Sequence, residues 1–143
     1  MLRLTKIFHF EMAHAIHGYQ GACKNIHGHS YELHVTLGTS SVQKEYIPTP
    51  GFIIDFKQIK NLVNVAIIEK FDHSLVLSEA YIKDHPTNHL HDNLIIWEVE
   101  PSAENILLYM QHVLNSKLPL DIKLLQIKLY ETKDSFAEWI SDN

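Results

Sequence analysis

Hydrophobic and polar residues alternate in two segments near the start of the chain. From Phe8 to Met12 every second residue is large and apolar, which predicts a strand that leads to His14. A glycine-containing loop over residues 15–25 separates it from a second strand, which is predicted over residues 26–38. The two strands are neighbours along the chain and can pair as a hairpin.

Two later segments repeat their apolar residues at helical spacing instead. The first covers residues 55–70, where Asp55 is a favourable N-cap and Gln58 stands in the capping-box position. The second covers residues 101–116, with an apolar stripe that begins at Ala103. The pattern therefore predicts two amphipathic helices.

Short apolar runs and a final alternating segment complete the pattern. Residues 75–77 and 94–97 predict a small side hairpin, with the polar residues 79–93 as its tip. Alternation over residues 125–130 predicts a strand, and residues 135–140 predict a last short one that pairs with it. The order strand, strand, helix, helix, strand, strand predicts an α+β domain with both helices on one face of an antiparallel sheet.

Composition narrows the class of protein. With 143 residues, 45% hydrophobic and 20% charged, residues 1–143 are expected to form a single globular domain. A formal net charge of −5 argues against nonspecific nucleic-acid binding and against attraction to an anionic membrane. No apolar run reaches membrane-spanning length. One cysteine cannot form an internal disulfide, so a reducing, cytoplasmic location is expected.

The strongest chemical signal is a cysteine followed by a His-x-His pair. Cys23 precedes His27 and His29 by four and six residues, and residues two apart on a strand point to one face. These two imidazoles can therefore share one metal ion. His14 is the best third ligand, because it ends the first strand where the pair begins the second. Zinc is the expected metal, since three neutral imidazoles leave a coordination position for substrate.

Four further residues offer proton transfer or recognition. A thiol at Cys23, held near a metal, can act as a base or nucleophile. Asp72 and His73 follow the first helix and can carry protons together. Glu131 ends an apolar row, where a carboxylate can accept two parallel N–H bonds. The plainer interpretations are a small buried thiol, a histidine favoured by a helix terminus and a charged strand end.

The remaining histidines carry weaker signals. His89 and His91 form a second His-x-His, but they stand in a polar loop and are predicted to be a solvated tip. His34 faces away from the pair on the second strand. Surface or cap positions are predicted for His9, His17, His85 and His112.

Six fragments in order resemble the 6-pyruvoyltetrahydropterin synthase family, which includes bacterial 6-carboxytetrahydropterin synthase. They cover nearly the whole chain, and their order makes the resemblance specific. The fragments are residues 10–14, 23–31, 51–56, 71–73, 101–105 and 130–132.

The resemblance implies the tunnelling fold, an α+β subunit with a four-stranded antiparallel sheet and two helices on one face. It further implies a homohexamer, built as a dimer of trimers, with active sites between subunits. His14, His27 and His29 match the zinc ligands of the family, and Cys23 matches its proton-abstracting thiol. The other matches are the proton-transfer dyad at Asp72 and His73, the pterin anchor at Glu131, and the pocket-flanking positions Ser102 and Glu104.

The implied activity is a zinc-dependent lyase reaction on 7,8-dihydroneopterin triphosphate. The first hypothesis is formation of 6-carboxy-5,6,7,8-tetrahydropterin for queuosine, with release of acetaldehyde and triphosphate. The alternative is the 6-pyruvoyl product from the same site. Two departures from the family pattern are Ser102, where threonine is commoner, and a longer segment between His73 and Pro101, whose loop 78–93 is expected to affect access or specificity.

Two hypotheses come from other classes of protein. His-x-His also marks cupin-like metal-binding proteins, which predicts an all-β chain. A regulatory pterin binder without turnover is the other, and it predicts that Cys23→Ala leaves the biological role intact.

Overall fold

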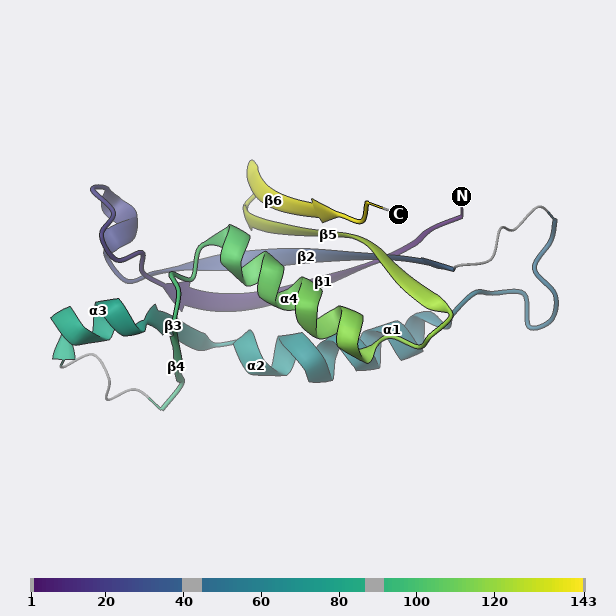
Figure 1. Cartoon of the computed structure of the whole chain (residues 1–143), viewed down its shortest axis with the longest axis horizontal. Coiled ribbons are helices and arrows are strands. Elements are labelled where there is room, and N and C mark those ends of the chain that lie inside the picture. The colour runs from purple at the N-terminus through teal and green to yellow at the C-terminus, as the bar shows by residue number, and fades with distance from the viewer. Residues whose placement is uncertain (1, 40–44, 87–91, 143) are drawn as a thin grey trace.

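A single mixed sheet organises the chain. The computed structural model describes residues 2–39, 45–86 and 92–142, and within them six strands follow the order β4-β3-β1-β2-β5-β6. Four of them form an antiparallel ribbon that runs along the molecule (Figure 1). These are β1 (Leu4–His14), β2 (His27–Thr39), β5 (Ile122–Thr132) and β6 (Ser135–Ile140). All four predicted strands are thus confirmed.

Alternation along β1 and β2 decides which face of the ribbon is buried. Phe8, Phe10 and Met12 are each 5% exposed or less, whereas the residues between them are exposed. Phe10 lies opposite Tyr31 of β2, and their rings stack with centroids 5.0 Å apart. Aromatic pairs of this kind stabilise neighbouring strands beyond their buried area.

The first helical run begins at the predicted capping box. It continues through α1 (Phe56–Val63), a π-helical turn η2 (Asn64–Ile68) and α2 (Glu69–Phe71). Asp55 Oδ1 accepts the Lys57 N–H at 2.8 Å, and Gln58 Oε1 accepts the Asp55 N–H at 3.3 Å. The capping box was therefore predicted correctly from residue types alone.

The second helix, α4 (Ala103–Lys117), is also confirmed. The helices lie on one side of the ribbon and cover its buried face (Figure 1). Fully buried residues of both helices form the core with the inner face of the sheet: Ile59, Ile67, Phe71, Ile106, Met110 and Leu114. Because an all-β chain has no such layer, the cupin-like hypothesis is wrong. None of the helices in the described ranges is both long and apolar enough to cross a membrane.

The predicted side hairpin is wrong. β3 (Ser74–Ser78) and β4 (Leu94–Trp97) run parallel to each other, and β3 runs parallel to β1. Parallel neighbours need a crossover connection, and the intervening segment supplies one that contains α3 (Glu79–Asp84). The four-stranded antiparallel sheet is therefore extended to a mixed sheet of six strands.

Part of the predicted loop 78–93 is thus the helix α3. The second His-x-His, at His89 and His91, lies outside the described residues.

Removal of the first capping box tests the helix assignment. Asp55→Ala leaves the Lys57 N–H without its acceptor, and we expect a loss of about 1 kcal/mol in the free energy of unfolding. Denaturant titration measures this, and Asp55→Asn is expected to retain most of the stability because its side-chain oxygen still accepts. An alanine variant as stable as the parent would contradict the role of the cap.

Candidate metal centre and its cleft

Three imidazoles meet where β1 ends and β2 begins. The antiparallel register places His14 opposite His27, and His29 follows two residues later on the same face. Their ring centroids lie 4.7, 4.8 and 5.2 Å apart. One nitrogen from each ring lies within 4.8 Å of the other two, so the three can bind a single ion.

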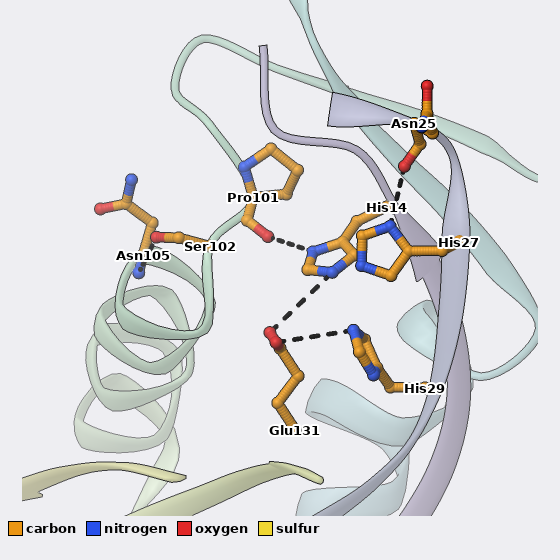
Figure 2. Close-up of polar contacts among 8 residues, drawn as sticks. All are labelled: His14, Asn25, His27, His29, Pro101, Ser102, Asn105 and Glu131. Atoms are coloured by element: carbon orange, nitrogen blue, oxygen red, sulfur yellow. Dashed lines mark hydrogen bonds and ion pairs between the residues drawn. The ribbon is translucent and has the colours of Figure 1, made fainter. Parts of the chain in front are cut away.

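Two backbone carbonyls orient the rings. Nδ1 of His14 donates to the Pro101 carbonyl at 2.7 Å, and Nδ1 of His27 donates to the Asn25 carbonyl at 2.7 Å (Figure 2). A carbonyl can only accept, so in the neutral rings the lone pair lies on Nε2. Partners of this kind on the second ring nitrogen accompany most metal-ligating histidines.

Three Nε2 atoms of the site, and the neighbouring Tyr31 hydroxyl, lack a hydrogen-bond partner among the described residues. The Nε2 atoms belong to His14, His27 and His29, and all three are buried. Buried polar atoms are ordinarily paired. Three converging nitrogens with lone pairs fit a divalent ion that accepts imidazole ligands, and the donor set matches catalytic zinc.

Burial favours the neutral, metal-binding form of two of these imidazoles, His14 and His29. Desolvation lowers the pKa of His14 and of His29 from the ordinary value, although the Glu131 carboxylate opposes the shift in both. Glu131 lies at the open side of the cluster, with its oxygens 3.5 Å from Nε2 of His29 and 3.9 Å from Nε2 of His14 (Figure 2).

A cleft of about 600 Å³ opens beside the cluster and brings several predicted site residues together. His14, Cys23 and Glu131 all line it, although they come from β1, from the short turn η1 (Ala22–Lys24) and from β5. A hydrogen bond from the Ile16 N–H to the Cys23 carbonyl at 2.8 Å closes the loop that carries the thiol.

Ser102 and Glu104 line the same cleft from the start of α4. The Ser102 hydroxyl is the N-cap, since it accepts the Asn105 N–H at 3.2 Å, and its side chain is turned away from the histidines (Figure 2). Glu104 is exposed. Ser102 therefore acts at the helix start, next to the Pro101 carbonyl that orients His14.

The structure does not bring Asp72 and His73 into this cleft. His73 lines a separate hollow of about 350 Å³, with His29 and Glu11 among its walls. Asp72 Oδ2 lies 3.0 Å from His73 Nδ1, and Oδ1 accepts the Glu11 N–H at 2.9 Å. The hydrogen bond from Glu11 is the main cause that lowers the pKa of the Asp72 carboxyl.

His73 has an unusual backbone conformation. Its φ of 61° is left-handed, which is uncommon for residues other than glycine and tends to mark functional sites. Two contacts hold it: its N–H donates to the Glu11 carbonyl at 2.6 Å, and Asn93 Nδ2 donates to its carbonyl at 2.8 Å.

Several residues that shape the site could not be predicted from the sequence. Pro101 and Asn25 act through carbonyl oxygens, which every residue type has, so no side-chain pattern reveals them. Asn93 hydrogen-bonds the His73 carbonyl from a distant part of the chain, and no sequence pattern indicates this contact. Tyr31 packs edge-on against His14 and His29, and burial raises the pKa of its hydroxyl.

Two of the residues predicted at surface or cap positions make side-chain contacts that the sequence did not indicate. His17 has a partner, because its Nε2 lies 3.2 Å from an Asp84 carboxylate oxygen. His85 is exposed and is the C-cap of α3, as predicted. Its ring also stacks on Tyr81, with ring centroids 4.3 Å apart. Both pairs link residues that the sequence pattern gave no reason to join.

Comparison with known proteins extends over nearly the whole chain. A family model described as 6-pyruvoyl tetrahydropterin synthase matches residues 3–141. A 6-carboxy-5,6,7,8-tetrahydropterin synthase from Rickettsia typhi is 32% identical over 142 residues, which are 96% of this chain and 99% of the relative. A 6-pyruvoyl tetrahydrobiopterin synthase from Pongo abelii is 29% identical over 120 residues, which are 82% of this chain and 69% of the relative.

A solved structure shows the same fold. The 6-pyruvoyl tetrahydropterin synthase of Caenorhabditis elegans has a TM-score of 0.70 at 20% identity, covering 99% of this chain and 96% of that one. The α+β architecture is therefore that of a pterin synthase, as the sequence resemblance predicts.

Metal titration tests the cluster. We expect metal-free protein to bind one divalent ion per chain. His27→Ala should weaken binding by more than about 100-fold, because loss of a residue that merely hydrogen-bonds a metal ligand already weakens metal affinity by up to about 100-fold. Calorimetry with Zn²⁺ measures both. His34→Ala is the matched control, because His34 contacts Glu32 outside the cluster and should leave affinity unchanged. Equal affinity in the parent and His27→Ala would rule out the site.

The lowered pKa values of His14 and His29 predict how the metal-free chain responds to acid. Both groups bind protons more readily when unfolded, so stability is retained above the unfolded pKa of about 6.5 and lost as the pH falls below it. Denaturant midpoints across this range measure the slope. A variant with His14→Gln and His29→Gln should show a shallower decline, and an identical slope would contradict the assignment.

Proposed function

Because the chain belongs to the 6-pyruvoyl tetrahydropterin synthase family, we propose that it converts 7,8-dihydroneopterin triphosphate to 6-carboxy-5,6,7,8-tetrahydropterin. Acetaldehyde and triphosphate are released, and one water is consumed. The observation that carries the proposal is one cleft lined by Cys23, Glu131 and His14, beside three imidazoles whose buried Nε2 atoms make no hydrogen bond among the described residues. Residues 1–143 act as a single catalytic domain.

Zinc is the proposed cofactor. His14, His27 and His29 would hold it through Nε2, which leaves one tetrahedral position for substrate. Bound there, zinc supplies Lewis acidity to the side-chain oxygens of the substrate and makes the neighbouring C–H protons easier to remove.

Cys23 is the proposed base. Its thiolate takes a proton from the substrate side chain, and the triphosphate leaves from the terminal carbon with the bonding electron pair. Asp72 and His73 form the proposed dyad that returns and removes protons, with the Asp72 carboxylate holding the His73 ring through Nδ1.

Glu131 is the proposed anchor of the pterin. Its carboxylate lines the cleft and can accept two parallel N–H bonds from the amino-pyrimidine edge of the ring. Ser102 and Glu104 border the same space. Ser102 supports substrate binding indirectly, by capping α4 next to the Pro101 carbonyl, and Glu104 offers a polar wall.

The separation of Cys23 from the dyad supports an oligomeric enzyme. Because His73 lines a different hollow from Cys23, a complete site would combine these residues from different copies. We propose a homohexamer, a dimer of trimers with sites between subunits. Pairing of the edge strands β4 and β6 between copies would also remove the open edges of the sheet. The thiol chemistry of Cys23 fits a reducing cytoplasm.

One other product is kept as an alternative. The 6-pyruvoyl product would come from the same residues, and the similarity to the Pongo abelii enzyme favours it. The carboxy product is preferred because the Rickettsia typhi relative matches over almost its full length. The hypothesis of a regulatory pterin binder without turnover is wrong, because the family and the relatives that the chain matches are synthases.

Product analysis with a thiol variant tests the function. The purified protein is incubated with 7,8-dihydroneopterin triphosphate, with and without a chelator, and products are identified by mass. We expect acetaldehyde and the carboxy pterin, loss of both with the chelator, and a rate about 10²- to 10⁴-fold lower in Cys23→Ala because the base is removed.

The zinc content of each variant distinguishes loss of the base from loss of the metal. Cys23→Ala should retain the metal, since Cys23 is not one of the three ligands, and His34→Ala should retain both metal and turnover. A pyruvoyl pterin without acetaldehyde would establish the alternative product. Unchanged turnover in Cys23→Ala would sink the proposed role of the thiol.

A further inference from the structure

A second cavity adjoins the cleft on the far side of the turn that carries Cys23. Its volume is about 460 Å³, and it shares Ile16 and Tyr19 with the cleft as common walls. Cys23 lines the cleft, whereas the next residue, Lys24, lines the second cavity. The turn η1 therefore divides two connected spaces.

The two spaces differ in charge. Among the described residues no lysine or arginine lines the cleft, but Glu104, Glu131 and Glu138 do. A group with several negative charges is poorly matched to such walls. The second cavity has a different character, because Lys24, His17 and His85 line it and no carboxylate among the described residues does.

The carboxylates around His17 decide which residues of the second cavity can contact an anionic ligand. Asp84 Oδ2 lies 3.2 Å from His17 Nε2, and Glu100 Oε1 accepts the His17 N–H at 2.6 Å. His17 is therefore already in contact with two carboxylates, which makes it a poor partner for an anionic ligand. His85 Nδ1 donates to the Tyr81 carbonyl at 3.1 Å, so a protonated ring presents Nε2 to a ligand. Lys24 and His85 are therefore the cationic contacts to consider.

Asn25 connects the second cavity to the metal centre. It lines the cavity, and its carbonyl accepts the Nδ1 proton of His27. The cavity and the candidate metal centre are therefore adjacent, with Asn25 common to both. α3, which contributes Tyr81 and precedes His85, lies at the same end of the molecule as η1 (Figure 1).

We propose that this second cavity binds the polyphosphate of the substrate, with Lys24 and His85 as its cationic contacts. The inference rests on the proposed function, since it assigns one part of the same substrate. It also gives the long segment after His73 a role, because the crossover carries His85 to the wall of this cavity.

The test uses zinc-loaded protein and three probes. These are 7,8-dihydroneopterin triphosphate, unphosphorylated 7,8-dihydroneopterin and inorganic tripolyphosphate. We expect Lys24→Gln and His85→Gln each to raise the KM for the triphosphate and the inhibition constant of tripolyphosphate by about tenfold, as for a lost charge-assisted hydrogen bond. Affinity for the unphosphorylated pterin should stay unchanged. Zinc content is measured after each titration, because tripolyphosphate itself binds metal.

A matched variant controls for net charge. Lys117→Gln removes the same charge at the end of α4, away from η1, and should change none of the three constants. Wild-type affinity for tripolyphosphate in Lys24→Gln and His85→Gln would overturn the inference. So would an equal loss of affinity for the unphosphorylated pterin, because that marks a general disturbance of the site.

Failure of the proposed function gives a different result. If wild-type protein binds tripolyphosphate through Lys24 and His85 but does not turn over the pterin triphosphate, the proposed substrate is wrong. The cavity then stands as a polyphosphate site. If wild-type protein turns over the pterin triphosphate but KM and the inhibition constant are unchanged in both variants, the proposed function stands and the cavity is not the polyphosphate site.

Discussion

The antiparallel register between β1 and β2 is the constraint on which the site depends. Opposed residues of such a pair lie on one face, so His14 and His27 meet only when this register holds. A slip of one residue would send each side chain of a strand to the other face. The stacked Phe10 and Tyr31 oppose such a slip, because their burial fixes which face looks toward the helices. Core packing thus sets the geometry of the metal centre.

A second layer of contacts orients two rings of the cluster so that the three histidines can act as ligands. The carbonyls of Pro101 and Asn25 hold hydrogens on Nδ1 of His14 and His27, which directs the lone pairs of Nε2 into one space. Pro101 precedes the N-cap of α4, so the start of that helix and the orientation of His14 are physically linked. Helix capping and metal binding therefore share one piece of backbone.

The loop between β1 and β2 separates two kinds of chemistry. The bond from Ile16 to the Cys23 carbonyl fixes a turn with the thiol on one side and Lys24 on the other. Acidic groups border the cleft on the thiol side, and cationic groups border the adjoining cavity. A substrate with a hydrogen-bonding ring at one end and phosphates at the other matches this division, because each part meets groups of complementary charge.

The sequence by itself determined the local elements and the chemical identity of the centre. Period-two alternation gave β1 and β2, helical spacing with the Asp55 cap gave α1, and the His-x-His pair with His14 gave the three-histidine cluster. These features are encoded by neighbours along the chain.

Only the tertiary structure decided which distant segments meet. The parallel pairing of β3 with β1 and the contact of the Pro101 carbonyl with His14 join residues far apart in sequence. The packing of the chain also keeps His73 out of the cleft that Cys23 lines. Short apolar runs such as β3 and β4 fit a parallel or an antiparallel neighbour equally well. A backbone carbonyl, likewise, has no residue-specific signature. The direction of the short strands and the carbonyls that contact the histidines therefore depend on the packing of the whole chain.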